Sequence, residues 1–437
     1  GYVGMINLPS WLFLSSFEKL RSNLLSQSKI ESLLHMGRGI FGIDWGSTAF
    51  TIRKTRQAEG TASFFRLHKR NFQHLYPEDI AKIFRKANSD HDFRFDFDKY
   101  RGEDGISEIA HSAETTAQRI FYSFEPLKFA RVPGSPIAFW ISDELADSFA
   151  GSESIGDIAQ PRQGLATSDN NRFLRSWHEV SIDAAAFNCI NREKALESEK
   201  KWFPYNKGGP LRKWFGNNEF FVNWEQDGKE LLEFAASLYG SPTRTIKNIQ
   251  HYFKDAITWS AISSSKLSVR KSDAGFVFDT KGQCVFSEDD EIKATLLSLL
   301  NSTVSFEILK ILAPTLDFNS GVIAKIPFRQ VDVSETTDGL ARIARSDWDA
   351  YETSWDFTAL PLLSPDHRGE TLADSYATLR AHWQSMTDEM QRLEEKNNRI
   401  FIDAYGLQDE LTPEVPIEEI TLTCNPAYRY NIKNDVG

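Results

Sequence analysis

The chain has 437 residues, of which 41% are hydrophobic and 25% charged, and its formal net charge is −11. This length is enough for two to four domains, and the composition is that of a soluble globular protein. No apolar run approaches the roughly 20 residues that cross a bilayer, so we expect no membrane partner. The three cysteines are widely separated, which argues against a zinc site or a disulfide framework and favours a reducing cytoplasm.

Positive charge gathers in the middle of this acidic chain. Residues 201–213 contain four Lys or Arg and no acid, and residues 241–271 contain six Lys or Arg and one Asp. Such clusters suit a surface that contacts nucleic-acid phosphates, and the aromatic residues interleaved with the first cluster suit a nucleic-acid groove. Charge alone equally allows ordinary solvated loops without a ligand.

The first 55 residues predict the closing part of an α/β sheet. Residues 2–7 look like a buried strand, and Ser15 with Glu18 has the spacing of a capping box that begins a helix. Residues 29–36 and 48–54 are then predicted as further strands. The resulting order is strand, helix, strand, strand, which favours the end of such a sheet over its beginning.

Residues 41–50, FGIDWGSTAF, are similar to the phosphate-binding hairpin of actin-like and sugar-kinase ATPases. Those proteins place the hairpin at their first strand and add two further nucleotide loops, neither of which is visible here. An actin-like ATPase is therefore kept as a remote alternative. After this stretch, a helix is predicted from about residue 110 to 150, and residues 146–163 are predicted as a linker rich in Gly, Ser and acids.

Two separated stretches favour a domain that recognises DNA. QGLATSDNNRFLRSWHEV, residues 163–180, predicts a polar turn followed by an apolar strand. Residues 296–328 predict a helix ending in Leu-Asn-Ser, a second helix and a short Ile-Pro strand. In this order the pair resembles the target-recognition domains of adenine methyltransferases and restriction specificity subunits, which generally contact bases in the major groove.

A nuclease-like pattern also occurs, because Asp279 is followed by Glu291 and Lys293 with the spacing of metal-dependent nucleases. In those enzymes the Glu-x-Lys lies on a strand. Here Ser287 precedes an acidic first turn of a predicted helix, whose N-terminus the acids stabilise. We therefore interpret this stretch as a helix start and expect no metal.

The last segment, residues 331–437, is expected to be mainly helical, and residues 369–405 carry its longest helical pattern. Near its end, NPAY at 425–428 is similar to the Asn-Pro-Pro-aromatic loop with which DNA adenine methyltransferases hold a flipped base. Such a loop needs the rigidity of a second proline, which Ala427 does not supply, and a neighbouring sheet. We therefore place no catalytic residue on Asn425.

Long blocks along nearly the whole chain, from residue 1 to about 431, resemble the BREX phage-exclusion DNA methyltransferases of the PglX family. The blocks are GYVGMINLPSWLFLSSFEKLR, GLATSDNNRFLRSWHEV, KWFPYNKGGPLRKWFGNNEFFVNWEQDGKE, ITWSAISSSKLSVR, GFVFDTKGQCVFS, DWDAYETSWDF and NRIFIDAYGLQDELTPEV. The resemblance implies an adenine methyltransferase domain that uses S-adenosylmethionine, followed by DNA-recognition and helical regions. It also implies methylation of an adenine in a short non-palindromic site and a role in excluding phage with other BREX components.

The same resemblance implies a mixed α/β fold in four parts. Residues 1–60 would be the C-terminal end of a Rossmann-like methyltransferase sheet, 61–160 a family-specific connecting region, 161–330 an α/β target-recognition domain, and 331–437 a helical region. The family's Gly-rich cofactor loop and its Asn-Pro-Pro-Tyr loop are expected upstream of Gly1. We therefore expect S-adenosylmethionine to bind outside this segment, and the segment alone to be inactive.

The expected DNA contacts combine the resemblance with polarity and charge. Asn and Arg in the polar turn suit base edges, because both side chains form bidentate hydrogen bonds with them, and the basic residues suit backbone phosphates. The candidates are Thr167, Asn170, Asn171 and Arg172 for bases, Lys207, Arg212, Lys213, Arg244 and Lys247 for phosphates, and Ser263, Ser264 and Arg270 as further contacts. For each of them a turn, a cap or an ordinary surface charge is an equally good explanation.

We therefore predict the recognition and C-terminal portion of an adenine-specific DNA methyltransferase that binds double-stranded DNA in the cytoplasm. In the intact enzyme the target base would be flipped out of the duplex, and methyl would be transferred directly to adenine N6. One alternative is a non-enzymatic specificity module that binds DNA for a separate catalytic partner. The actin-like ATPase would instead bind nucleotide and no DNA.

Overall fold

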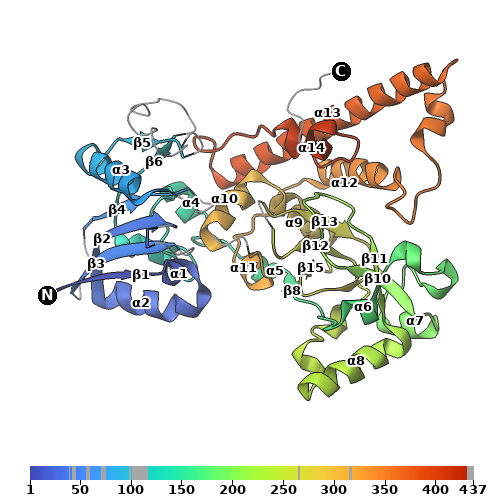
Figure 1. Ribbon diagram of the computed structural model, residues 1–437, viewed down its shortest axis with the longest axis horizontal. Helices are drawn as coiled ribbons and strands as arrows, with labels where there is room; N and C mark the ends of the chain where they lie inside the picture. Colours follow the sequence, from blue (N-terminus) through green and yellow to red (C-terminus); the bar gives the residue numbers. More distant parts are fainter. Residues whose placement is uncertain are drawn as a thin grey trace. The chain divides into compact units, whose positions relative to one another are not determined.

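The computed structural model divides into two compact units, whose elements are labelled in Figure 1. Unit 1 comprises Gly1–Gly151 and Lys310–Pro314, and unit 2 comprises Ser152–Leu309 and Thr315–Gly437. The structure describes residues 1–38, 40–41, 46–55, 60–69, 75–97, 100, 117–263, 266–313 and 317–430. The division at Gly151–Ser152 falls inside the Gly- and Ser-rich stretch 146–163.

Unit 1 is built on a five-stranded sheet with the strand order β1-β3-β2-β4-β7. Its strands are β1 (Tyr2–Asn7), β2 (Ser28–Gly37), β3 (Ser47–Lys54), β4 (Ala62–Arg66) and β7 (Phe121–Phe124), and a separate pair consists of β5 (Arg94–Phe95) and β6 (Gln118–Arg119). Strands β2 and β4 run parallel, whereas the other neighbours in the large sheet are antiparallel. The predicted order of strand, helix, strand, strand over the first 55 residues is confirmed.

The two faces of this sheet pack into separate cores, because successive residues of a strand point to opposite faces. Phe64 of β4 lies in the core that α1 (Ser10–Phe13) and α2 (Glu18–Gln27) help to cover. Its neighbour Phe65 lies in the other core, which α3 (Pro77–Ser89) covers. The inner strands of this sheet are therefore packed against helices on both faces.

Predictions for the start of unit 1 need correction in two places. β1 is a strand at an edge of the sheet, but all six of its residues are exposed and none is buried as predicted. Helix α2 begins at Glu18 after a 3₁₀ turn over Ser15–Phe17, so Ser15 is not its N-cap. Residues 42–45 of the FGIDWGSTAF stretch lie outside the described residues, and Ser47–Lys54 forms β3 between β1 and β2.

The helix predicted from about 110 to 150 is also wrong for the part that the structure describes. From residue 117 onward the chain forms β6 and β7, then the 3₁₀ helix η2 (Pro126–Arg131) and the short helix α4 (Asp143–Asp147). Prolines at 126, 133 and 136 explain the difference, because proline in a helix interior removes a hydrogen bond and clashes with the preceding turn.

Unit 2 contains two four-stranded sheets, with the strand orders β14-β10-β11-β9 and β13-β12-β15-β8. The strands are β8 (Gln160–Arg162), β9 (Leu174–Ser176), β10 (Trp202–Asn206), β11 (Phe220–Asn223), β12 (Ala256–Ser260), β13 (Val269–Ser272), β14 (Val277–Phe278) and β15 (Gly282–Phe286). The chain passes from β14 of the first sheet to β15 of the second through residues 279–281. This turn therefore lies where the two sheets meet.

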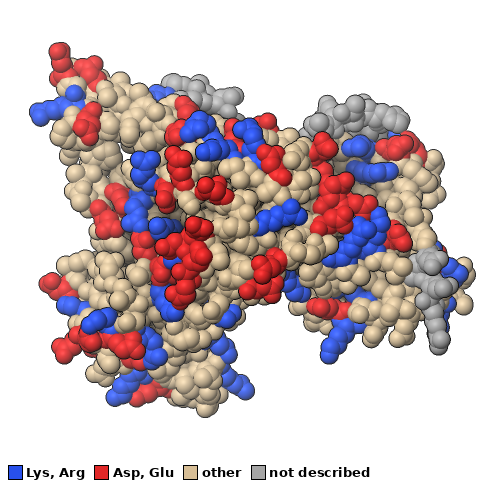
Figure 2. All heavy atoms as spheres, turned by 180° about the vertical axis from the view of Figure 1, so that it is seen from behind, with Lys and Arg blue, Asp and Glu red and all other residues tan. Residues whose placement is uncertain are grey.

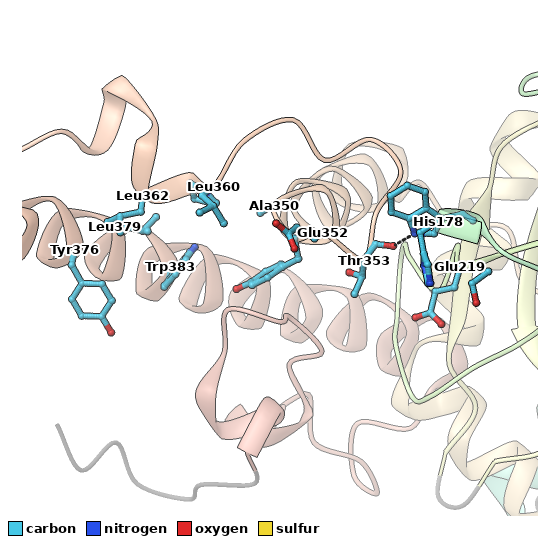
Figure 3. Close-up of a pocket in the computed structure, with 14 residues that line it drawn as sticks. His178, Glu219, Ala350, Glu352, Thr353, Leu360, Leu362, Tyr376, Leu379 and Trp383 are labelled. Carbon is cyan, nitrogen blue, oxygen red and sulfur yellow. Dashed lines mark hydrogen bonds between the residues drawn. The ribbon is translucent and has the colours of Figure 1, made fainter. Parts of the chain in front are cut away.

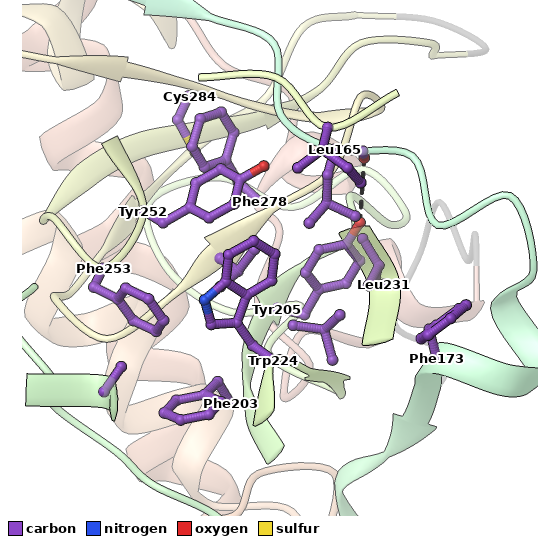
Figure 4. Packing of buried hydrophobic residues seen from close by; sticks show 14 of the residues in the cluster. Leu165, Phe173, Phe203, Tyr205, Trp224, Leu231, Tyr252, Phe253, Phe278 and Cys284 are labelled. Atoms are coloured by element: carbon purple, nitrogen blue, oxygen red, sulfur yellow. Dashed lines mark hydrogen bonds between the residues drawn. The ribbon is translucent and has the colours of Figure 1, made fainter. Parts of the chain in front are cut away.

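Aromatic side chains from both sheets fill one shared core, shown in Figure 4. Phe203 and Tyr205 come from β10, Cys284 comes from β15, and Trp224 immediately precedes α8 (Glu225–Tyr239). The rings of Trp224 and Tyr252 meet edge to face with their centroids 5.1 Å apart, a favourable geometry for aromatic pairs. Because the core spans both sheets, a loop at the end of either sheet has a fixed place relative to the other.

The remaining helices of unit 2 lie before, between and after these strands. They are α5 (Ile155–Ile158), α6 (Asn170–Phe173), α7 (Arg192–Glu197), α9 (Asp290–Leu300), α10 (Thr303–Leu312, whose end belongs to unit 1), α11 (Ser320–Ile323), α12 (Ser334–Asp349), α13 (Leu372–Tyr405) and α14 (Pro426–Tyr430). The long helical pattern predicted over 369–405 is confirmed by α13, which has 34 residues and begins with a capping box between Thr371 and Asp374. Most residues in the first half of α13 are exposed, whereas its second half carries most of its buried residues.

In the described part of the chain no single helix has the length and apolar composition of a membrane span. Helices α9 and α10, which are bent by 73° relative to one another, reach that composition only when taken together.

Two histidines are buried side by side in unit 1. His35 and His68 have their ring centroids 4.0 Å apart, and neither ring nitrogen of His35 has a hydrogen-bond partner among the described residues. Burial lowers the pKa of His35 well below its usual 6.5, and the neighbouring His68 and Arg66 lower it further. Burial, followed by the charge of Arg66, lowers the pKa of His68 to about 3.

Replacing His35 with Phe is expected to make the free energy of unfolding less dependent on pH below 6.5. The folded chain keeps this ring neutral, whereas the unfolded chain takes up a proton, so stability present above pH 6.5 is lost as the pH falls. The variant should therefore lose about 1.4 kcal/mol less per pH unit between pH 6 and 4.5. Urea unfolding at several pH values measures the slope. His382→Gln, at an exposed position on α13, is the control substitution, and an unchanged slope in His35→Phe would contradict the prediction.

Candidate nucleic-acid interface

Loops from both sheets of unit 2 form a continuous polar edge, which we call the polar rim: residues 163–172, 239–248, 207–210, 260–263 and 279–281. Backbone hydrogen bonds connect these loops. Ala166 donates to the carbonyl of Thr245 at 2.9 Å, and Thr280 donates to the carbonyl of Leu165 at 2.9 Å. The amide of Gly209 donates to Ser260 Oγ at 3.0 Å, which joins the 207–210 loop to the end of β12. These hydrogen bonds therefore fix the loops of the rim relative to one another.

The buried carboxylate of Asp279 is the centre of the polar rim. It accepts hydrogen bonds from Tyr205 Oη at 2.8 Å, from Lys207 Nζ at 2.6 Å and from the backbone N of Lys281 at 2.7 Å. Burial, together with the charge of Asp279, raises the pKa of Tyr205 well above its usual value, so this phenol stays a donor. Asp279 thus fixes the 279–281 turn against the 207–210 loop.

Two glycines allow the loops of the rim to approach this closely. A Cβ on Gly164 would lie 1.8 Å from the carbonyl oxygen of Phe278, and one on Gly282 would lie 2.1 Å from the carbonyl oxygen of Asn206. Both neighbours are backbone atoms and cannot swing aside. The Gly in the QGLATSDNN stretch is therefore required by backbone packing between two loops.

The polar turn presents two exposed amides, as the sequence predicts. Thr167 is buried and donates from Oγ1 to Oδ1 of Asn170 at 2.6 Å, so it orients that amide and does not itself face solvent. Asn170 and Asn171 are exposed at the start of α6, and the amide nitrogen of Asn170 has no partner among the described residues. Arg172 is exposed but pairs with Glu230 at 2.8 Å and lies over the ring of Phe234.

The basic candidates of the rim fall into two groups. Arg244 is exposed and Lys247 half-buried, and neither forms an ion pair with any described carboxylate. Lys207 is paired with Asp279, and its side chain is 29% exposed. Sequence reasoning missed a further cation, Lys281, which is exposed and without an ion pair in the described structure. The signal for it in the sequence is the Asp-Thr-Lys-Gly pattern of a turn between two strands.

Three predicted phosphate or DNA contacts lie in the protein interior, which corrects their assignment. Arg212 pairs with Asp347 at 2.8 Å, and Lys213 pairs with Glu394 at 2.6 Å. Arg270 is 1% exposed and donates to the carbonyl oxygen of Arg212 at 3.2 Å. Burial and the charge of Arg212 lower the pKa of Arg270 to about 10. A side chain held in this way cannot reach a phosphate without leaving a buried partner.

Two serines were also predicted as contacts. Ser263 lies on the rim, where its hydroxyl donates to the carbonyl of Lys266 at 2.7 Å. Ser264 lies outside the described residues.

The basic segments 201–213 and 241–271 therefore do not form one positive surface. Several of their cations are neutralised by acids from elsewhere in the chain. The pairs are Lys201 with Glu225 at 3.8 Å, Lys254 with Glu288 at 3.2 Å and Lys266 with Glu419 at 2.5 Å, in addition to those of Lys207, Arg212 and Lys213. On the face shown in Figure 2, basic and acidic side chains are interspersed. The rim cations that have no ion pair among the described residues are therefore the ones available to bind a ligand.

Hydrogen bonds within the fold hold the NPAY stretch in place. Asn425 is 2% exposed, and its amide donates to the carbonyls of Ile417 at 2.8 Å and Ile420 at 2.9 Å. Its Oδ1 accepts from the backbone N of Ala427, and Tyr428 Oη donates to the carbonyl of Leu211. The amide that a catalytic loop would offer to a base is thus fully used within the fold.

The nuclease-like residues do not form a metal site. Lys293 pairs with Asp255 and Asp290, whereas Asp279 pairs with Lys207, and Asp289 caps α9 by accepting from the amides of its first turn. In the described ranges, no group of three or more His, Cys, Asp or Glu is arranged to hold a metal ion. The interpretation of this stretch as a helix start is confirmed by α9.

Comparison with known proteins finds two curated relatives over nearly the whole chain, whereas no family model matches. The adenine-specific methyltransferase PglX of Lacticaseibacillus casei (strain Zhang) is 32% identical over 447 residues, covering 100% of this chain and 34% of the relative. The adenine-specific methyltransferase BrxX of Escherichia coli O9:H4 (strain HS) is 31% identical over 438 residues, covering 98% of this chain and 32% of the relative. The chain thus spans about a third of the length of the curated relatives that it matches.

Among solved structures, the chain is similar to the Type IIL restriction-modification enzyme MmeI in complex with DNA. The TM-score is 0.50 at 11% sequence identity, and the match covers 99% of this chain and 50% of that one. At this identity the likeness concerns the fold alone. The predicted mixed α/β class is confirmed, whereas the role of residues 1–60 as the end of a methyltransferase sheet stays a prediction.

Replacing Asp347 with Asn is expected to lower the free energy of unfolding by about 3–5 kcal/mol, because it leaves the buried guanidinium of Arg212 without its counter-charge. Glu389→Gln is a matched control on α13, since Glu389 pairs with Arg392 at 2.7 Å in an exposed position. That control should cost less than about 1 kcal/mol. Urea unfolding measures both losses, and equal small losses would show that the buried pair does not hold unit 2 together.

Proposed function

We propose that this chain, a member of the PglX family of BREX proteins, is the DNA-recognition and C-terminal part of an adenine-specific DNA methyltransferase. The curated relatives are named adenine-specific methyltransferases, and this chain corresponds to about a third of their length. The observation that carries the DNA-recognition role is the polar rim, where unpaired cations lie beside exposed amides on one fixed set of loops. The structural neighbour MmeI, which has a similar fold, is bound to DNA.

In this proposal the cations of the rim hold the DNA backbone. Arg244, Lys247 and Lys281 have no ion-pair partner in the described structure, so binding a phosphate breaks no internal pair. Lys207 contributes less, because its ammonium group already serves Asp279 at 2.6 Å. Phosphate contacts of this kind set the position and register of a duplex and carry no sequence information.

Sequence would be recognised by the polar turn. Asn170 and Asn171 are exposed at the start of α6, and an Asn side chain pairs in a bidentate manner with adenine N6 and N7. The hydroxyl of Thr167 donates to Oδ1 of Asn170, so the amide is oriented before DNA binds. Arg172 would act mainly by keeping α6 against α8 through Glu230, because its guanidinium is already paired.

The described residues do not fit an S-adenosylmethionine site, so no methyl-transfer step is assigned to them. A nucleotide-like cofactor binds at the carboxyl ends of parallel strands, where a Gly-rich turn leads into a helix. In unit 1 the parallel pair is β2 and β4. Strand β2 leads on to β3 without an intervening helix among the described residues, and the sequence between β4 and α3, residues 67–76, contains no glycine. In unit 2 the parallel pair is β10 and β14, and in the described chain each is followed by a strand. In the proposal, base flipping, methyl transfer and work with other BREX components in the cytoplasm belong to the whole protein.

Reversing the charge of Arg244, Lys247 and Lys281 together is expected to weaken binding of a 30-base-pair duplex and flatten its salt dependence. Each lost phosphate contact should reduce the slope of log K against log salt by about 0.9. Fluorescence anisotropy between 50 and 200 mM salt measures the slope. Lys396→Glu is the control, because this lysine is exposed on α13 and is unpaired within the described residues. An equal slope in triple variant and control would contradict the role of the rim.

The base-recognition part of the proposal has a different signature in the same assay. Asn170→Ala with Asn171→Ala should leave the salt slope unchanged, since neither side chain is charged. It should reduce discrimination between a selected target duplex and an unrelated one by about 1–3 kcal/mol per lost bidentate contact. Unchanged discrimination would remove the polar turn from the proposed interface without touching the phosphate contacts.

Isothermal titration of this chain with S-adenosylmethionine is expected to show no binding up to millimolar ligand. The reason is that, among the described residues, no parallel strand of either unit leads through a Gly-rich turn into a helix. Titration of a longer family member provides the positive control. Micromolar binding by the present chain would contradict the placement of the cofactor site outside it.

A further inference from the structure

Unit 2 carries a second surface that the DNA-recognition role does not use, a groove of about 770 Å³ shown in Figure 3. Its walls come from the 3₁₀ helix η3 (Trp177–Glu179), the turn after α12, the 3₁₀ helix η7 (Pro361–Leu363) and the first half of α13. The indole of Trp177 donates from Nε1 to the carbonyl of Thr353 at 3.0 Å and so joins η3 to the turn after α12. This hydrogen bond therefore fixes two walls of the groove relative to each other.

Most of the lining of this groove is apolar or aromatic. Leu360 is 52% exposed and Tyr376 is 50% exposed, and the rings of Tyr351 and Trp383 also line it. Large apolar side chains that remain exposed together on one surface mark a place where another molecule binds. The first half of α13, which lines the groove, is mostly exposed, whereas the second half carries most of the helix's buried residues.

The charged residues of the groove have one sign. Glu219 and Glu352 line it, and no Lys or Arg is among its lining residues. Neither carboxylate takes part in an ion pair with a described residue. Figure 3 shows Glu219 beside His178, Glu352 farther along, and Tyr376 at the opposite end. A duplex or other polyanion is therefore disfavoured here, whereas a cation gains from both the carboxylates and the aromatic rings.

We propose that this groove binds a short segment of a partner protein that presents apolar side chains flanked by Lys or Arg. The apolar side chains would fill the space between η7 and α13, and the basic side chains would pair with Glu219 and Glu352. An amphipathic helix laid in an apolar groove is a common form of such recognition. This surface differs in its chemistry from the polar rim, which carries the unpaired cations Arg244, Lys247 and Lys281.

Selection of peptides from a random 12-residue display library on the whole chain tests this proposal. Enriched peptides should combine Leu, Trp or Phe with Lys or Arg. Their affinity, measured by fluorescence anisotropy with a synthetic copy of the most enriched peptide, should fall at least about tenfold in Leu360→Ser and in Tyr376→Ser. These positions are exposed, so the variants should fold, and thermal unfolding checks this. Leu238→Ser is the matched control, because Leu238 is 50% exposed on α8 and does not line the groove.

The charge component has its own variant. Glu219→Gln with Glu352→Gln should weaken the basic peptide several-fold at low salt and make its binding less sensitive to salt, as expected for exposed ion pairs. Arg244→Glu with Lys247→Glu, which alter the rim, should leave peptide affinity unchanged. Recovery of no peptide, of acidic peptides, or of peptides that bind all groove variants equally would overturn the proposal. Displacement of the peptide by duplex DNA from the groove would overturn it as well.

Discussion

A carboxylate removed from water must have its hydration replaced, and in unit 2 this requirement joins parts of the chain that are far apart in sequence. Asp347 on α12 accepts from the guanidinium of Arg212 at 2.8 Å and from the backbone amides of Thr423 at 2.7 Å and Cys424 at 2.9 Å. These partners come from two segments, the loop after β10 and the C-terminal segment, so the full set of contacts forms only when both are in place against α12. The cost of removing both charges from water offsets much of their attraction, so the ion pair adds little net stability. Its larger effect is on the specificity of folding.

The same rule sorts the many cations of the basic segments into structural and available ones. Lys213 is held by Glu394, which also accepts from the indole of Trp214, and this second buried pair ties the sheets of unit 2 to α13. The cations that matter for a ligand are the few left without acids, such as Arg244 and Lys281. Positive charge counted along a sequence is therefore a poor guide to positive surface when acids arrive from distant segments.

The sequence was informative where a local pattern determines the structure, and uninformative where tertiary partners do. The helical periodicity of residues 369–405 predicted α13, and the Gly-Leu-Ala-Thr stretch predicted an exposed polar turn, because both depend on neighbours in the chain. The burial of Arg212 was not predictable, since its partner Asp347 lies 135 residues away. Lys281 was not predicted, because its turn is organised by Asp279, whose hydrogen-bond donors Tyr205 and Lys207 lie more than 70 residues away in the sequence.

These charge assignments imply a particular balance in the proposed recognition of DNA. A chain with a net charge of −11 and few unpaired cations on its rim gains little from non-specific attraction to phosphate. Discrimination must then come from base-edge contacts made by a rim whose geometry is fixed beforehand, which is the effect of Asp279 and of the close backbone approach at Gly164. A groove with unpaired carboxylates on the same unit is compatible with this balance, because it repels the duplex and leaves the rim as the favourable place for DNA to bind.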